Sequence, residues 1–137
     1  MIQSHVLDTI RKEIIFSGRD TRYKIEAYSF VLQVINYLHT RAGERRHYTG
    51  QELSKVCVDF ALKQFGPLTQ GVFEYWGIQS TSDLGYIVYN LIDITLLKKQ
   101  ESDSIEDFFN VFDLKEYCTR QDYYTIDTTY IKTIKGV

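Results

Sequence analysis

The chain has 137 residues, of which 44% are hydrophobic and 25% charged, and its formal net charge is −2. This composition is typical of one globular domain, so we expect a single domain at residues 1–118 and an extended tail at 119–137. The near-neutral charge excludes an overall basic surface of the kind that binds phosphate backbones. No stretch approaches the roughly 20 apolar residues that span a bilayer, and the N-terminus lacks the basic start and apolar run of a signal peptide. We therefore expect a cytoplasmic protein without membrane contact.

Hydrophobic periodicity predicts a compact bundle of about five helices. The first two segments, 4–16 and 23–39, place apolar residues three and four positions apart, which is typical of amphipathic helices. The second is the most apolar stretch and is expected to be the central helix. The two stripes consist of Val6, Leu7, Ile10, Ile14 and Ile15, then Ala27, Phe30, Val31, Val34, Ile35 and Leu38.

The stretch 49–92 contains the clearest helix boundaries. Thr49-Gly50-Gln51-Glu52 has the pattern of a capping box, and Gly66-Pro67 is expected to end that helix and begin the next. Gly77 should end the second helix, and Thr81 or Ser82 should cap a third. Because these connections are short, the three helices must pack together, and we expect Trp76 to be buried against the central helix.

The C-terminal part has a different composition. Residues 94–112 are expected to form a small β-hairpin, which after a third helix would be winged-helix-like; alternatively, Ser104-Ile105-Glu106-Asp107 could cap a short helix. The segment 122–135 is dense in Tyr, Thr and Ile, a composition that favours an extended strand. Such a strand could pair with the hairpin, lie over the bundle or pair with another chain.

Several short segments resemble those of a family of small uncharacterised bacterial proteins, over roughly residues 22–116. The resemblance implies a bacterial cytoplasmic domain, and it assigns no catalytic residue because the family has no assigned activity. The segments are Tyr28-Ser29-Phe30-Val31, Thr49-Gly50-Gln51-Glu52-Leu53, Gln64-Phe65-Gly66-Pro67-Leu68, Trp76-Gly77-Ile78, Asp83-Leu84-Gly85 and Asp107-Phe108.

No motif of metal, cofactor or nucleophilic chemistry stands out. His5, His39 and His47 fall on separate segments, and Cys57 and Cys118 are far apart, whereas zinc sites usually contain close ligand pairs. No glycine-rich loop leads from a strand into a helix with a following lysine. We expect no metal, no cofactor and no catalytic residue at these positions.

Three structural roles are expected instead. Cys57 lies on an apolar helix face and should be a small buried hydrophobe. The carboxylates of Glu52 and Asp83 should stabilise helix starts. The third helix would turn Asp83, Tyr86, Tyr89 and Asn90 outward, and because it contains no Lys or Arg, it is unsuited to reading DNA.

Two surfaces could bind a partner. The tail, with Tyr124, Ile126 and Tyr130, would offer a strand edge for a protein partner or a second copy of the chain. The loop Arg41, Arg45, Arg46, His47 and Tyr48 could join Arg19, Arg22, Tyr23 and Lys24 in a contact with single-stranded nucleic acid. A non-enzymatic binding or adaptor domain is therefore the first hypothesis. A nucleic-acid-associated protein is the alternative, and an enzyme with an unrecognised site comes third.

Overall fold

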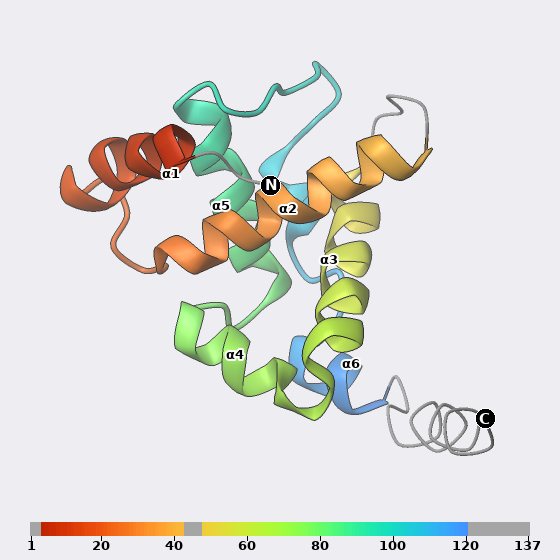
Figure 1. Cartoon of the computed structure of the whole chain (residues 1–137). Helices are drawn as coiled ribbons and strands as arrows, with labels where there is room; N and C mark the ends of the chain where they lie inside the picture. Colours follow the sequence, from red (N-terminus) through yellow and green to blue (C-terminus); the bar gives the residue numbers. More distant parts are fainter. Residues whose placement is uncertain (1–3, 43–47, 121–137) are drawn as a thin grey trace.

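The computed structural model describes residues 4–42 and 48–120, and these residues form helices and turns without a strand (Figure 1). The predicted mainly helical class is confirmed. The predicted tail strand and the candidate residues Arg45, Arg46, His47, Tyr124, Ile126 and Tyr130 lie outside the described residues. The helices are α1 (Ser4–Ile10), α2 (Ile25–Ala42), α3 (Gly50–Phe65), α4 (Thr69–Trp76), α5 (Thr81–Asp93) and α6 (Leu114–Arg120), with short η1 (Arg11–Phe16), η2 (Gly66–Leu68) and η3 (Ile105–Phe108) between them.

Helix α2 is the centre of the bundle, as the sequence predicts. It contacts α1, α3, α4 and α5, and in Figure 1 it runs diagonally in front of α5, with α3 beside it and α4 below. Helix α6 packs on α4 at the lower end of the molecule. It continues to Arg120, two residues past the expected end of the domain at 118.

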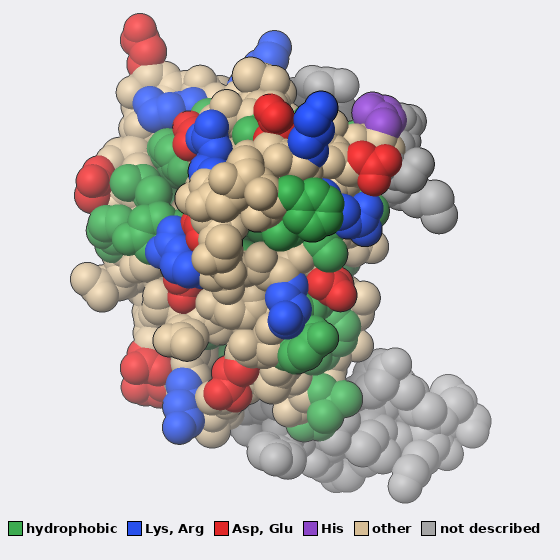
Figure 2. All heavy atoms as spheres, turned by 90° about the vertical axis from the view of Figure 1, so that its left-hand side faces the viewer, with side chains coloured by type: hydrophobic (Ala, Val, Ile, Leu, Met, Phe, Trp, Pro, Cys, Tyr) green, Lys and Arg blue, Asp and Glu red, His purple; other side chains and the backbone are tan. Residues whose placement is uncertain are grey.

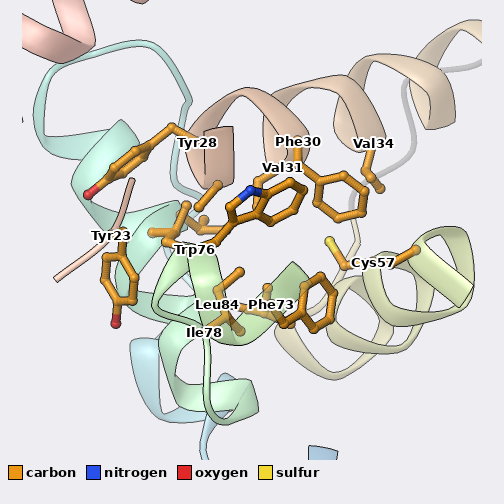
Figure 3. Packing of buried hydrophobic residues seen from close by; sticks show 14 of the residues in the cluster. Tyr23, Tyr28, Phe30, Val31, Val34, Cys57, Phe73, Trp76, Ile78 and Leu84 are labelled. Carbon is orange, nitrogen blue, oxygen red and sulfur yellow. The ribbon is translucent and has the colours of Figure 1, made fainter. Parts of the chain in front are cut away.

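The core forms where α2, α3 and α4 meet, and it is rich in aromatic rings (Figure 3). Trp76 at the end of α4 is 9% exposed and lies 5.3 Å from Phe30 of α2 and 6.1 Å from Phe73, measured between ring centroids. Tilted and edge-on ring pairs at such distances add to the free energy of burial. The predicted burial of Trp76 against the central helix is confirmed.

The predicted helix boundaries are largely confirmed because short-range side chains set them. Thr49 and Glu52 form the expected capping box at the start of α3. Gly77 ends α4 with φ of +95°, a conformation that costs glycine little. A Cβ atom at Gly77 would lie 2.1 Å from the carbonyl oxygen of Arg22, so this position also requires glycine for close packing.

The predicted β-hairpin at 94–112 is wrong for this stretch. After α5 the chain turns at Thr95 and later forms η3, where Ser104 and Asp107 make a capping box, as the alternative interpretation had it. Two glycines explain why η3 is held here. A Cβ atom at Gly85 would lie 2.7 Å from Cβ of Phe108, and one at Gly50 would lie 2.7 Å from Cβ of Asp107, so both glycines allow η3 to pack closely on α5 and α3.

Candidate binding groove

A groove of about 680 Å³ lies beside the C-terminal half of α2. This volume is within the range of ligand-binding pockets in proteins, roughly 300–1,000 Å³. The groove is lined by residues of α1, α2, α3, α5, η3 and the turn between α5 and η3. These include Val6, Leu32, Ile35, Asn36, Leu38, His39, Tyr48, Gly50, Leu53, Val88, Tyr89, Ile92, Leu96, Leu97, Lys98, Gln100, Asp103, Ser104, Asp107 and Phe108.

Apolar side chains from α2 and α5 form part of its surface. Leu32 and Ile35 on α2 line the groove together with Val88 and Ile92 on α5. Leu32, Ile35 and Ile92 are only partly buried, although they pack against the core. A partner that covered them would remove further apolar surface from water, which is favourable by about 25 cal/mol per Å².

The turn after α5 forms one wall, and its backbone is strained. Thr95 has φ of +63°, a left-handed conformation that is unusual for a β-branched residue. This conformation turns the chain back so that the Leu96 N–H donates to the carbonyl oxygen of Leu91 at 2.9 Å. Leu96 and Leu97 thereby line the groove.

One edge of the groove is acidic. Asp103 accepts a 2.8 Å hydrogen bond from the Gln100 N–H, and Asp107 accepts a 3.3 Å bond from the Ser104 N–H. Both carboxylates therefore stabilise local turns while they line the groove. The close packing of η3 on α5 fixes the position of Asp107.

Tyr89 lies next to this edge and has an unsatisfied hydroxyl. Its oxygen is buried and has no hydrogen-bond partner within residues 4–42 and 48–120, which costs about 1–3 kcal/mol. Burial raises the pKa of Tyr89, and the negative charges of Asp103, Asp107 and Glu106 raise it further. The phenol is therefore a neutral hydrogen-bond donor near three carboxylates.

A second polar cluster connects the turn before α2 to α5. The Asp20 carboxylate accepts two bonds from the Arg22 guanidinium, at 3.0 and 2.7 Å, and one of 2.9 Å from Asn90. Burial alone would raise the pKa of Asp20, but the hydrogen bonds from Arg22 and Asn90 outweigh it and lower the pKa to about 2. Asn90 also donates to the Tyr28 hydroxyl at 3.1 Å. This cluster therefore has a structural role: it links the turn before α2, and α2 itself, to α5.

The same cluster partly covers the face of α5 that the sequence places outward, and Asp83, Tyr86, Tyr89 and Asn90 are half-buried there rather than exposed. Tyr23 donates its hydroxyl proton to Asp83, and the Arg22 guanidinium lies 4.4 Å from the ring centroid of Tyr86. Asp83 also accepts from the backbone N–H groups of Gln79 and Ser80. Its predicted role at the helix start is confirmed, and the cap is Ser80, one residue earlier than expected.

Of the basic residues that could have formed one patch, Arg45, Arg46 and His47 lie outside the described residues, and Lys24 and Arg41 belong to opposite ends of α2. Helix α2 has 18 residues, which at 1.5 Å per residue is about 27 Å, and Lys24 precedes it whereas Arg41 is near its end. Arg19 and Arg22 are also paired with the carboxylates of Asp93 and Asp20. Of the candidate loop, Tyr48 lines the groove.

The surface offers no extended patch of one charge on the face that Figure 2 shows. There, Lys and Arg side chains alternate with Asp and Glu, and hydrophobic side chains appear in small separate groups. The most exposed large hydrophobic residues lie on different elements: Phe16 on η1, Leu68 on η2 and Tyr75 on α4. Isolated exposed residues of this kind are ordinary.

The remaining chemistry is limited. Cys57 is buried, as predicted, and burial raises its pKa to about 12 and that of Cys118 to about 11. Within residues 4–42 and 48–120, no group of three or more His, Cys, Asp or Glu side chains is arranged to hold a metal ion. None of the described helices is both long enough and apolar enough to cross a membrane.

Sequence analysis did not identify the groove. The pair Leu96–Leu97, followed at once by a polar segment with four carboxylates up to Asp107, is its only local signal. No protein-family model, curated protein or solved structure matches the chain.

Proposed function

We propose that this chain is a non-enzymatic binding domain that acts through contacts with another protein. The observation that supports the proposal is the groove, because it combines partly exposed apolar side chains of α2 and α5 with a polar edge. Protein-binding sites commonly have an apolar centre and a polar rim. We also propose that the protein is one of the small bacterial cytoplasmic proteins that its sequence resembles.

Two surfaces are candidates for this contact. The groove is the one that the described residues provide, and the segment 122–137 is the one that its composition suggests, through pairing with a partner or with a second copy of the chain. An association with nucleic acid through Arg41, Arg45, Arg46, His47 and Tyr48 is the alternative, and a winged-helix mode of reading DNA is not favoured because α5 has no Lys or Arg.

An affinity purification with matched variants tests the proposal. Full-length protein, Ile92→Glu and Leu68→Glu are each used to capture partners, with and without nuclease treatment. Ile92 lines the groove, whereas Leu68 is 69% exposed on η2 and does not, so both variants add the same charge at different places. Circular dichroism spectra verify that both variants remain folded.

The expected result is a nuclease-resistant partner that Leu68→Glu retains and Ile92→Glu loses. If the partner is instead lost when residues 122–137 are deleted, the contact is assigned to the tail. Co-purifying RNA or DNA that nuclease removes would favour the alternative. Identical partners for all variants would contradict a role for the groove.

A further inference from the structure

The groove differs from an ordinary apolar depression because one of its edges concentrates negative charge. Asp103 and Asp107 line this edge, and Glu106 belongs to the same short segment. Among the other described lining residues, Lys98 is the basic one and His39 is titratable. The formal charge of the whole chain is only −2, so the acidic edge is a local feature.

The secondary structure around the groove indicates what kind of segment fits it. The described residues contain no strand, so they offer no sheet edge to an extended peptide. The groove is instead lined by residues of two long helices, α2 and α5. Apolar grooves between helices commonly receive one face of an amphipathic helix.

We propose that the groove binds an amphipathic helical segment of a partner protein, whose apolar side chains enter the groove and whose Lys or Arg side chains lie along the Asp103–Asp107 edge. This inference rests on the proposed function and adds the chemistry of the partner. The ring of Tyr89 lines the groove next to the same edge, and its buried hydroxyl has no hydrogen-bond partner among the described residues.

Electrostatics explains why charge would select the partner. Carboxylates beside an apolar surface attract a cationic chain and repel an anionic one, so they affect specificity more than total affinity. Because Asp103 and Asp107 are both held by backbone N–H groups, their positions are fixed before binding. Fixed charges lose little conformational freedom when the partner arrives.

A set of three synthetic peptides of about 16 residues, an adequate length for a helix of four turns, tests the inference. The first has a leucine stripe at helical spacing flanked by lysines, the second has the same stripe flanked by glutamates, and the third keeps the lysines but replaces leucine by glutamine. Binding to full-length protein is measured by fluorescence anisotropy. NMR shifts of the Ile92, Leu96 and Leu97 methyl groups locate the peptide.

The leucine–lysine peptide should bind about tenfold more tightly than the leucine–glutamate peptide at low salt, and the difference should shrink in about 0.5 M salt because screening weakens charge contacts. The double variant Asp103→Asn with Asp107→Asn should remove most of the difference, since amide oxygens still accept the turn hydrogen bonds. Glu74→Gln also replaces a carboxylate by an amide, but on α4 and away from the groove. It should leave the difference in affinity between the two peptides unchanged.

The outcomes separate the two proposals. If both leucine peptides shift the groove methyl groups and bind equally well, the charge preference is wrong and the binding function remains. If neither binds, or if the lysine peptide without leucine binds as well as its parent, the groove is not a helix-binding site. Binding with shifts elsewhere on the protein would also contradict the inference.

Discussion

The side-chain amide of Asn90 donates a 2.9 Å hydrogen bond to the Asp20 carboxylate, although 70 positions separate the two residues. The same amide donates to the Tyr28 hydroxyl. Asn90→Ala should lower the free energy of unfolding by about 1–3 kcal/mol, because it leaves a partly buried network without its donor. Urea denaturation measures this, and Gln33→Ala, an exposed change on α2, should stay within about 0.5 kcal/mol of the parent. If both substitutions changed the free energy of unfolding equally, the hydrogen bonds of Asn90 would contribute nothing to stability.

The Asp20 carboxylate predicts a pH dependence of stability. Its pKa is lowered in the folded protein from 3.8 to about 2, so its ionised form stabilises the fold above about pH 4, and this contribution is lost as the pH falls towards 2. Asp20→Asn should therefore be less stable than the parent by about 2 kcal/mol at pH 6, and the difference should narrow between pH 5 and pH 2. Urea denaturation across this range measures it, and a difference that is constant with pH would contradict the assignment.

The indole of Trp76 provides a test of the aromatic core. Trp76→Ala should destabilise the protein by about 3–5 kcal/mol, since it removes the contacts with Phe30, Phe65 and Phe73. Tyr75→Ala is the matched control, because Tyr75 is the preceding residue, is 66% exposed, and has its ring 4.9 Å from the Lys24 ammonium at the surface. It should cost no more than about 1 kcal/mol. Thermal denaturation of the two variants would refute this core assignment if their midpoints fell equally.

Local signals explain which part of the fold the sequence predicts well. The capping box at Thr49 and the left-handed Gly77 involve atoms within a few residues of each other, so they are visible in the sequence as patterns. The stripe on α2 likewise predicts its central place, because a helix with so wide an apolar face must be surrounded.

The candidate site could not be predicted in the same way, because it depends on contacts between distant segments. The polar face of α5 suggests exposure, yet the turn before α2 and η3 cover it through Arg22 and Phe108. The β-permissive residues at 94–97 suggest a strand, but backbone bonds from Leu96 back to Leu91 hold them against the end of α5. Tertiary packing overrides propensity in both places.

The position of η3 gives a fourth prediction. Gly85→Ala should destabilise the protein by about 1–3 kcal/mol, because the new methyl group would approach Cβ of Phe108 to 2.7 Å and push η3 away from α5. Gly71→Ala is the control: no atom lies within 4 Å of its Cβ position on α4, and alanine should stabilise that helix by up to about 1 kcal/mol. Chemical denaturation of both variants should thus give changes of opposite sign, and two changes of the same sign would show that η3 is not closely packed.

The turn that forms the groove wall gives the last prediction. Thr95 and Asn110 both have positive φ, 63° and 53°, but asparagine tolerates this conformation better than the β-branched threonine. Thr95→Gly should therefore raise the free energy of unfolding by about 1 kcal/mol. It should do so even though it removes the 2.6 Å hydrogen bond from the threonine hydroxyl to the Ile94 carbonyl oxygen. The control Asn110→Gly should change the free energy of unfolding little. Strained residues persist where the surrounding structure or function holds them, so the stabilised Thr95→Gly protein should also be assayed with the leucine–lysine peptide. Weaker peptide binding in the more stable variant would assign the strain to the groove; unchanged binding would assign it to the end of α5 alone.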